Sequence, residues 1–358
     1  MPSIHILTNG FVTQTARAFL APLITHRRLL RSAGFDIRIF RSLATEVPDC
    51  DVLIVESKFY KDLWSSNERR ALQDFESFRN SSALVVFADT GDSTGNVIAQ
   101  VLPYVDSYWK AQLWRDRSAY ETALYGGRPY TDYYHRNFGV TDSSVRMSVP
   151  VDREFLPKLR VSWNLGFTNY GFLGPRLADA YMFKDLDIFI RPIRRISRPG
   201  HKRNIELFLR MNLEYSRETV AYQRRQVVKR LQHRTQPQAG RVGRFRYLRE
   251  LCDAKVVVSP FGWGEINVRD FEAILCGAAL LKPNMEHIET YPDVFHDGET
   301  IISHKWDLSD LESVIASASD SDLSAIASRA QKEYLDQVSG ESFKGRFLGL
   351  LGEVTRDR

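Results

Sequence analysis

The sequence predicts an α/β protein made of two doubly wound, Rossmann-like units, each with a mainly parallel sheet. Strand-like apolar runs alternate with helical segments through the first 110 residues, which is the pattern of a parallel sheet covered by helices. The same alternation starts again after an aromatic, glycine-containing middle region. The length of 358 residues fits two domains of ~100–200 residues each.

The first unit is expected to hold five strands joined by helices. A helical segment that runs to Ser32 ends at Gly34. The run at 35–40 alternates apolar and charged residues, as an edge strand does, whereas DVLIVE at 51–56 and ALVVFA at 83–88 are typical of strands buried on both faces. The expected strands lie at 4–7, 35–40, 51–56, 83–88 and 105–109.

The second unit follows a connector rich in aromatic residues, Gly and Asn, with a hinge expected between residues 171 and 185. Gly277 is expected to end one of its helices. Strands are expected at 187–191, 255–259, 279–282 and 300–303. Helices are expected at 204–232, 245–254, 265–276, 310–323, 324–335 and 341–353, the last interrupted by glycines.

The composition and the N-terminus are typical of a globular, cytoplasmic protein. The three cysteines (Cys50, Cys252 and Cys276) have no paired spacing, which argues against a disulfide framework or a cysteine metal site. The N-terminus lacks a basic segment followed by an apolar one, so we expect no signal peptide. No apolar run reaches the ~18–20 residues that span a bilayer.

Positive charge is concentrated in one stretch of the chain. The net charge is +5, but residues 191–249 contain seventeen Lys and Arg against three Glu. This stretch can be a solvated face of long helices, a surface for anionic membrane lipids or another anionic ligand, or a nucleic-acid surface. Because it lacks regularly interleaved aromatic residues and a recognisable motif, no nucleic acid is expected.

Residues 255–284 read as strand, glycine loop, helix and strand. Gly262 and Gly264 flank Trp263 and precede a helix whose N-terminus points at the crevice beyond the strand ends. Free amides and the helix dipole there favour a phosphate, and Arg269 adds a positive charge. Glu272 can accept hydrogen bonds from a ribose. The alternative is a turn whose glycines only allow tight packing. Trp263 can stack on a base or sugar, or pack under the loop.

The motif R-x-F-E-A-x-x-x-G-x-x-L spans residues 269–280, within the longer string from SPFGWGE to LLKP. It resembles the C-terminal signature of GT-B glycosyltransferases, and the longer string is similar to their bacterial family-1, CgeB-like branch. The resemblance covers roughly residues 244–320. The N-terminal half is similar only as a generic α/β unit. Proteins of this branch are often tied to the synthesis of surface polysaccharides.

The resemblance implies a GT-B fold in which two Rossmann-like domains face an interdomain cleft. Residues 1–175 would form the acceptor domain, residues 176–340 the nucleotide-sugar donor domain, and residues 341–358 a helix that packs back on the N-terminal domain. The expected reaction moves a hexosyl or related group from a nucleotide sugar to a glycan or lipid-linked hydroxyl. The nucleotide sugar is a co-substrate, and no cofactor is expected. No His–carboxylate cluster has ligand spacing, so no metal is expected either.

Site residues follow from the motif and from the strand ends. The second glutamate of the family's E-x7-E pattern, which binds the donor ribose, falls on Glu272. The first falls on Gly264, whereas this sequence has Glu265 one place later, so a retaining or an inverting outcome stays open. An inverting route needs a base on the acceptor hydroxyl. The expected catalytic residues are Asp89, Asp92 and Glu265; the expected donor-binding residues are Gly262, Trp263, Gly264, Arg269, Glu272, Arg191 and Lys282, with Arg194 as a further cation.

The predicted strands also indicate where two histidines lie. His287 follows a strand and can reach the cleft, whereas His5 lies inside a strand and is expected in the core. The other functions that the sequence leaves open are a non-catalytic polyanion binder built on residues 191–249 and a sugar-nucleotide epimerase with a GT-B-like fold.

Overall fold

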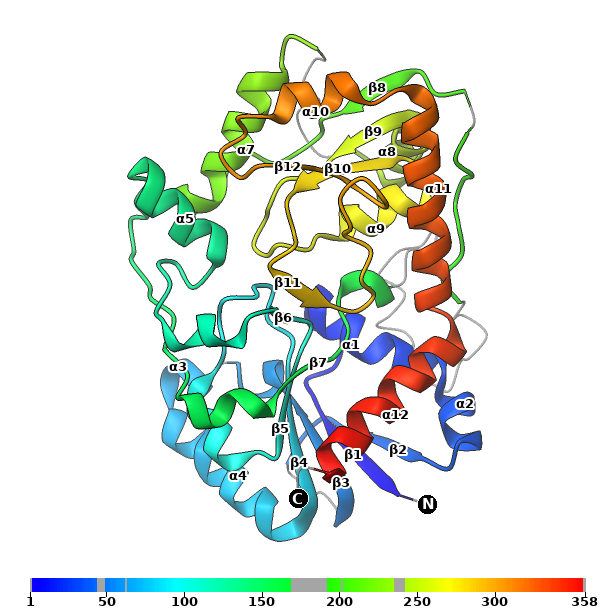
Figure 1. Ribbon diagram of the computed structural model, residues 1–358. Coiled ribbons are helices and arrows are strands. Elements are labelled where there is room, and N and C mark those ends of the chain that lie inside the picture. Colours follow the sequence, from blue (N-terminus) through cyan, green and yellow to red (C-terminus); the bar gives the residue numbers. More distant parts are fainter. Residues whose placement is uncertain are drawn as a thin grey trace.

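The computed structural model describes residues 2–43, 49–61, 63–168, 192–200, 202–234 and 242–356. In these ranges the chain forms two parallel sheets, one in each half, with a small antiparallel pair of strands between them (Figure 1). The strands are β1 (Ser3–Leu7), β2 (Asp36–Phe40), β3 (Cys50–Glu56), β4 (Ser82–Asp89), β5 (Ser107–Lys110), β6 (Gln112–Trp114), β7 (Leu159–Val161), β8 (Ile205–Phe208), β9 (Ala254–Val258), β10 (Ala279–Pro283), β11 (Ile288–Thr290) and β12 (Ile302–His304).

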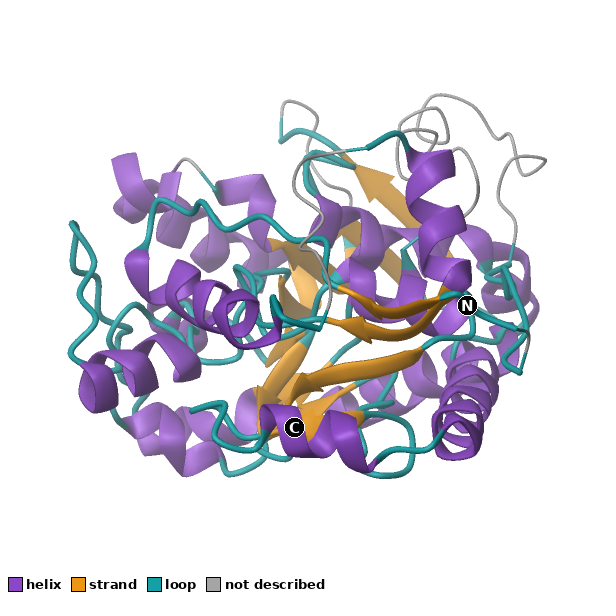
Figure 2. Ribbon diagram, turned by 90° about the horizontal axis from the view of Figure 1, so that it is seen from above, coloured by secondary structure: helices purple, strands orange, loops and turns teal. Residues whose placement is uncertain are grey.

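Helices cover both faces of the sheets, so that the strands lie in the middle of the molecule when it is seen from above (Figure 2). The helices are α1 (Gln14–Thr25), α2 (Arg27–Ser32), α3 (Leu63–Ser66), α4 (Glu68–Ser81), α5 (Pro129–Phe138), α7 (Glu218–Leu231), α8 (Arg244–Asp253), α9 (Val268–Leu275), α10 (Leu311–Ser317), α11 (Asp320–Gln337) and α12 (Gly340–Arg356).

The N-terminal sheet has six parallel strands in the order β2-β1-β3-β4-β5-β7. The alternating strand β2 lies at an edge and the apolar strands β3 and β4 lie inside, as their patterns predict. Strand β7 was expected to be part of a loop. It forms because Leu159 and Val161 pair with Tyr108 and Lys110 of β5. Such a tertiary contact cannot be predicted from three residues of sequence.

The C-terminal sheet has four parallel strands in the order β12-β10-β9-β8. The expected helix at 204–232 is wrong in its first part, because residues 205–208 form β8 and only α7 is helical. Ile205, Leu207 and Phe208 pair with β9, and pairing with a buried neighbour overrides helical spacing in a short segment. The expected strand at 187–191 and the expected hinge at 171–185 lie outside the described residues.

Three further helices differ from expectation. Helix α5 forms in a region expected to be irregular; Pro129 is its first residue, and it ends at Gly139, whose φ is 64°. Helix α11 begins after Ser319, whose side chain forms a capping box with Asp322. Helix α12 continues through Gly345, Gly349 and Gly352 instead of being interrupted by them.

Two of the contacts between the halves involve regular secondary structure. Strands β6 and β11 pair antiparallel, with Ile288 opposite Trp114. Helix α12 returns to the N-terminal half, beside α2 and β1 (Figure 1), where Phe347 packs edge-on against Phe35 and Trp109 with ring centroids 6.3 Å away in each case. In the described part of the chain, no helix is both long and apolar enough to cross a bilayer.

Candidate functional site

A cleft of about 750 Å³ lies between the two halves, at the carboxyl ends of strands from both sheets. From the N-terminal half it is lined by residues that follow β1, β3 and β4; from the C-terminal half it is lined by residues that follow β8 and β9 and by the first half of α9. Parallel sheets place their ligand crevices at this edge. Two Rossmann-like sheets with one cleft between them are the GT-B arrangement, which confirms the predicted fold class.

The loop after β9 carries the two predicted glycines, and both are needed for space inside the protein. A Cβ on Gly262 would lie 2.6 Å from the Asn267 side-chain oxygen, and a Cβ on Gly264 would lie 1.9 Å from the backbone oxygen of Asp92. Tight packing, the alternative left open above, therefore explains both glycines. Trp263 lies at the rim of the cleft with 40% of its surface exposed, next to Tyr215 and Arg128.

Helix α9 begins at Val268, later than the predicted start at Glu265. Asn267 is its N-cap, and Asp270 closes a capping box by accepting a hydrogen bond from the Asn267 amide. The Asp270 carboxylate is fully buried and also forms an ion pair of 2.8 Å with Lys282, which is fully buried as well. Burial lowers the pKa of Lys282, against the opposing effect of Asp270. Lys282 is therefore buried and paired, and it does not line the cleft. The predicted contact of Lys282 with a donor is wrong for this reason.

Four cations do line the cleft. Arg269 lies on α9 and Arg224 on α7, while Lys58 and Lys61 reach it from the N-terminal half. In the described ranges none of the four makes an ion pair with a carboxylate. Lys58 acts at longer range on Glu56, Asp89 and Asp92 and lowers the pKa of each. The Arg269 Nε is buried and has no hydrogen-bond partner among the described residues. Unpaired positive charge of this kind is costly to bury and favours an anionic ligand.

Arg224 is a site residue that the motif analysis did not include. Its side chain is 6% exposed; Nε donates to the Phe261 carbonyl at 2.6 Å, and the guanidinium lies 5.0 Å from the centre of the Tyr215 ring. Burial lowers the pKa of Arg224 to about 10, and Arg269 acts in the same direction. The signal was present in the sequence: Arg224 occupies the apolar face of α7, four residues after Val220 and three before Val227.

Glu272 borders the cleft but already has two partners. Arg244 Nη1 and Tyr247 Oη, both on α8, donate to its two oxygens at 2.8 and 2.9 Å. These bonds hold the carboxylate in one orientation, and each oxygen keeps a further lone pair. Ribose binding by Glu272 stays a prediction that this geometry allows.

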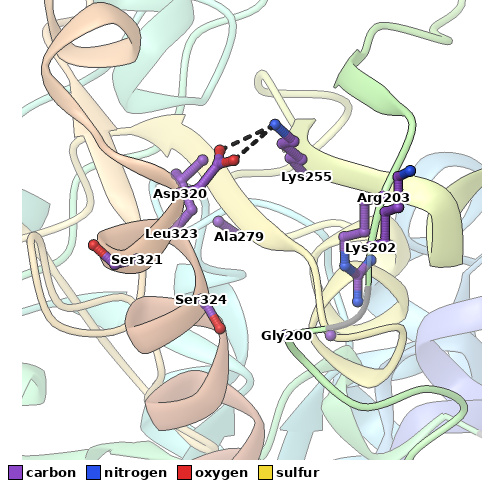
Figure 3. A pocket seen from close by; sticks show the side chains of 10 residues that line it. Gly200, Lys202, Arg203, Lys255, Ala279, Asp320, Ser321, Leu323 and Ser324 are labelled. Atoms are coloured by element: carbon purple, nitrogen blue, oxygen red, sulfur yellow. Dashed lines mark hydrogen bonds and ion pairs between the residues drawn. The ribbon is translucent and has the colours of Figure 1, made fainter.

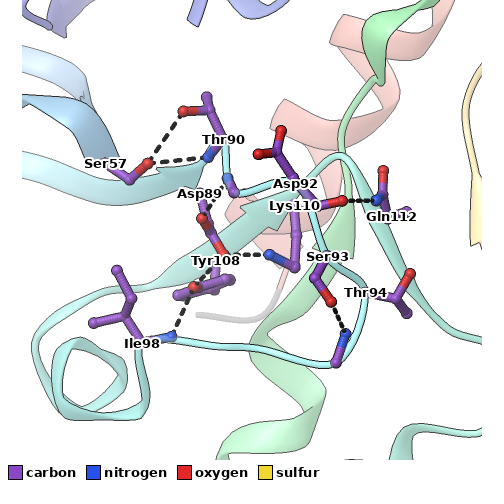
Figure 4. Close-up of polar contacts among 12 residues, drawn as sticks. Ser57, Asp89, Thr90, Asp92, Ser93, Thr94, Ile98, Tyr108, Lys110 and Gln112 are labelled. Atoms are coloured by element: carbon purple, nitrogen blue, oxygen red, sulfur yellow. Dashed lines mark hydrogen bonds and ion pairs between the residues drawn. The ribbon is translucent and has the colours of Figure 1, made fainter. Parts of the chain in front are cut away.

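Asp89 and Asp92 occupy different surroundings, although they are three residues apart (Figure 4). Asp89 is buried, with Lys110 Nζ at 2.5 Å and Tyr108 Oη at 2.8 Å. Burial alone would raise the pKa of Asp89, but Lys110 outweighs it and the pKa is lowered. A carboxylate held so firmly in its charged form is a poor proton acceptor, so the structure favours a structural role for Asp89.

Asp92 is the candidate base that the geometry supports. Its side chain is exposed to the cleft, stands apart from the Asp89–Lys110 pair, and accepts no hydrogen bond from any described residue (Figure 4). The surrounding protein raises the pKa of Asp92, against the pull of Lys58 and Arg128. A carboxylate with a raised pKa in a cleft has the properties of a general base.

Glu265 lies at the contact between the two halves and is fully buried. It accepts hydrogen bonds from the Thr94 amide at 3.0 Å, from Gln112 Nε2 at 3.4 Å and from the Ser93 hydroxyl at 3.5 Å. Burial raises its pKa. The predicted catalytic role is therefore not supported, because Glu265 does not line the cleft and instead ties the loop after β9 to the loop after β4.

The remaining candidates lie elsewhere. His287 is half-buried between Trp114 and Trp306, with ring centroids at 5.1 and 4.9 Å, and burial lowers its pKa to about 4. It does not line the cleft, so the expectation that it reaches the cleft is wrong. His5 is buried in β1 as predicted. Arg191 lies outside the described residues, and Arg194 is exposed but does not line the cleft. Among the described residues no group of three His, Cys, Asp or Glu has a geometry that can hold a metal ion.

A second cavity of about 630 Å³ lies at the opposite, amino-terminal end of β9 and β10 (Figure 3). Lys255, near the start of β9, forms ion pairs there with Glu206 at 2.8 Å and with Asp320 at 3.0 Å. Arg203 donates to the carbonyl groups of Cys252 and Cys276. Lys255 and Arg203 therefore have partners, and the remaining cation of the lining, Lys202, is exposed to solvent.

No family model and no curated protein matches the sequence, so the CgeB-like branch stays a prediction. Similar solved structures include a glycosyltransferase from Rickettsia africae ESF-5, with a TM-score of 0.47, 9% identity, and coverage of 100% of this chain and 99% of that one. HepE from Anabaena in complex with UDP has a TM-score of 0.46, 10% identity, and coverage of 98% and 100%. An α-glucosyltransferase in complex with UDP-glucose and DNA containing an abasic site has a TM-score of 0.42, 11% identity, and coverage of 99% of both chains. At these values the similarity carries nothing about the site, whose chemistry rests on its own residues.

Proposed function

We propose that this protein is a glycosyltransferase that takes a sugar from a nucleotide sugar and passes it to a hydroxyl acceptor. The observation that supports this most is the set of cations in the cleft. Arg224 and Arg269 meet beside the start of α9 without an ion pair among the described residues, and Lys58 and Lys61 face them from the other half. A diphosphate matches this arrangement because guanidinium groups bind phosphate oxygens bidentately.

The walls of the cleft suit the other parts of such a donor. Tyr215, Tyr247 and Trp263 are aromatic residues that line it and can stack on a base or a sugar ring. Glu272 can accept hydrogen bonds from a ribose diol on its remaining lone pairs. The diphosphate would lie between Arg224 and Arg269, with the sugar directed toward Asp92 on the opposite wall.

The chemistry then needs only groups that the chain supplies. The acceptor oxygen forms a bond to the anomeric carbon, the bond from that carbon to the phosphate oxygen breaks, and the nucleoside diphosphate leaves with the electron pair. Arg224 and Arg269 stabilise the growing charge on the phosphate, so we propose a reaction without a bound metal. In an inverting reaction Asp92 takes the proton of the acceptor hydroxyl. In a retaining reaction the donor phosphate takes it, and both outcomes stay open.

The finer parts of the proposal concern where the enzyme acts. We propose a hexosyl or related group as the cargo, a glycan or lipid-linked acceptor, and a role in surface polysaccharide or glycoconjugate synthesis. The cytoplasm, with peripheral contact to an anionic membrane through the basic stretch at 191–249, is the proposed location. These statements rest on the sequence resemblance and on the charge of that stretch.

The test is a thermal-shift and calorimetric screen of the full chain against UDP-, GDP- and CMP-sugars, because a ligand that binds the folded state raises the melting temperature. Arg269→Ala should weaken donor binding about tenfold or more, as expected for the loss of a charge-assisted hydrogen bond. Arg249→Ala is the matched control, because Arg249 is exposed on α8 and does not line the cleft. A screen without any stabilising nucleotide sugar, or equal affinity in the two variants, would overturn the proposal.

Product analysis separates the enzyme classes. A transferase releases nucleoside diphosphate in proportion to the glycosylated acceptor, whereas an epimerase converts the sugar nucleotide alone. A non-catalytic polyanion binder would show steep salt dependence and no turnover.

A further inference from the structure

A smaller cavity of about 280 Å³ lies next to the cleft, and most of its lining residues belong to the N-terminal half. Asp92 lines both spaces, so a group bound in the smaller cavity lies beside the candidate base. The wall between them contains Arg128, whose Nε donates to the carbonyl oxygen of Trp263 at 2.6 Å and whose guanidinium lies 5.5 Å from the centre of the Trp263 ring.

The cavity is strongly positive. Arg128, Arg146 and Arg217 line it together with Lys110, and Asp92 is the one acidic residue among its described lining residues. Lys110 is neutralised by Asp89, but none of the three arginines forms an ion pair with a carboxylate in the described ranges. Burial lowers the pKa of Arg217, and the neighbouring Arg128 and Arg146 lower it further, against the opposing effect of Asp142. Three guanidinium groups that repel one another around one cavity favour an anion between them.

The backbone keeps two of these arginines in place. Arg128 Nη1 and Arg217 Nη1 both donate to the carbonyl oxygen of Gly126, at 3.0 and 2.9 Å. Gly126 and the adjacent Gly127 have φ angles of 71° and 68°, in the left-handed region that favours glycine. A Cβ on Gly126 would also lie 2.6 Å from the Thr131 hydroxyl. The glycine pair therefore turns one carbonyl toward two arginines, and the Nη2 groups of both arginines stay available to a ligand, whereas Arg128 Nε is used by Trp263.

Two helices also begin at this cavity. Arg128 is the N-cap of α5 and Arg217 is the N-cap of α7, and neither side chain caps its own helix. The N-terminus of α7 is already capped by Asp142, which accepts hydrogen bonds from the Thr219 amide and hydroxyl at 2.9 Å. The positive end of the α5 dipole has the same sign as the three arginines and adds to their charge.

We propose that this cavity is the acceptor subsite and that it takes an anionic group of the acceptor, a phosphate or a carboxylate. The acceptor role rests on the proposed function, whereas the binding of an anion does not. An acceptor held by its anionic group at Arg128, Arg146 and Arg217 would present a nearby hydroxyl to Asp92. The enzyme would then select anionic acceptors over neutral ones, because a neutral acceptor leaves the arginines unpaired.

The anionic group can belong to a soluble sugar or to a lipid head group. Val145, Met147 and Val149 flank Arg146 and are 60%, 52% and 49% exposed. An exposed apolar segment beside a phosphate site is compatible with a membrane surface. The two sources share the chemistry of the proposed site and are distinguished by experiment.

The first experiment measures phosphate binding to the full chain saturated with UDP, so that the cleft is occupied. Inorganic phosphate is titrated calorimetrically into the wild type, into Arg146→Ala and into Arg69→Ala. Arg146 is exposed, so its removal should not disturb folding, and Arg69 is an exposed arginine on α4 outside the cavity. We expect phosphate affinity to fall about tenfold in Arg146→Ala and to stay unchanged in Arg69→Ala.

Equal affinity in Arg146→Ala and the wild type, or no phosphate binding to the wild type, would overturn the proposal. UDP affinity serves as the separate readout of the proposed function, and it should be the same in Arg146→Ala and the wild type. If neither UDP nor any other nucleotide of the donor screen binds while Arg146→Ala still weakens phosphate binding, the proposed function fails and the anion site stands.

The second experiment identifies the source of the anion by cosedimentation with vesicles of phosphatidylcholine, with and without phosphatidylglycerol. Vesicle binding that is lost in a Val145→Ser, Val149→Ser variant, with phosphate affinity retained, supports a lipid head group. Phosphate binding without vesicle binding supports a soluble anionic sugar. An equal loss of vesicle binding in Arg69→Ala and Arg146→Ala would show unspecific charge attraction and would count against the site.

Discussion

Gly264 lies where the loop after β9 touches the backbone of the loop after β4. A Cβ at this position would lie 1.9 Å from the Asp92 carbonyl oxygen and 2.7 Å from its carbonyl carbon. Both atoms belong to the main chain, so no side-chain rotation can relieve the clash. To reach ordinary contact at 3.4 Å the two loops must separate by roughly 1.5 Å. Gly264→Ala should therefore open the contact between the two halves.

The cost can be worked out from the neighbouring contacts. Forcing an extra methyl group into a packed interior costs about 1–3 kcal/mol. The separation also stretches the bonds that hold the buried carboxylate of Glu265 to Thr94 and Gln112, now at 3.0 and 3.4 Å. A buried group that loses a hydrogen bond costs about 1–3 kcal/mol more. We expect Gly264→Ala to lower the free energy of unfolding by about 2–6 kcal/mol, a large part of the ~5–15 kcal/mol of a typical domain.

Urea unfolding of the full chain measures this free energy, with Gly349→Ala as the control. Gly349 lies inside α12 with nothing within 4 Å of an added Cβ, so its replacement should stabilise the protein by about 0.5–1 kcal/mol. A lower free energy of unfolding for Gly264→Ala and a higher one for Gly349→Ala would support the reasoning. A Gly264→Ala protein as stable as the wild type, with donor binding intact, would refute the close contact and the reason given for this glycine.

Three further predictions concern single side chains. Lys282→Met leaves the carboxylate of Asp270 buried without its partner and should lower the free energy of unfolding by about 3–5 kcal/mol; unchanged stability with weaker donor binding would instead place Lys282 in the cleft. His287 has a pKa of about 4 in the folded protein against 6.5 ordinarily, so the unfolded state binds more protons between these values. Its contribution is complete above pH 6.5 and decreases by up to about 3 kcal/mol as the pH falls toward 4. In a pH series of unfolding measurements His287→Phe should remove that part of the slope, and a slope equal to that of the wild type contradicts its burial in the neutral form. Asp92→Asn should lower kcat by roughly 10²–10⁴ with donor affinity unchanged if Asp92 is the base; a kcat near that of the wild type would favour the retaining route or another base.

The apolar runs were sufficient to predict the centre of each sheet. Strands β3, β4, β9 and β10 lie where continuous apolar runs predicted them. A continuous apolar run is enough to identify a strand that is buried on both faces. Strands β7 and β8 were missed, since they have three and four residues and gain their stability from pairing with a neighbour.

The position of the site could be predicted more reliably than the role of each residue. The loop after β9 and the start of α9 do line the cleft, as the motif indicated. Lys282 and Glu265 were misassigned because side-chain direction and burial depend on tertiary partners: Asp270 of the same half pairs with Lys282, and Thr94 of the other half binds Glu265. The sequence N-x-x-D at Asn267 and Asp270 is a capping signal that would have corrected the helix start.

The sequence by itself determined the class of fold, the positions of its strongest strands along the chain and the segment that borders the ligand cleft. These properties depend on local patterns of apolar and polar residues, which can be recognised within short segments of the sequence. The tertiary structure alone decided which charges are free. It pairs Lys282 with Asp270 and Lys110 with Asp89, and it leaves Arg224, Arg269 and the arginines beside Asp92 without carboxylate partners in the described ranges. Pairing of this kind depends on distances between residues far apart in the sequence, and the electrostatic character of both cavities follows from it.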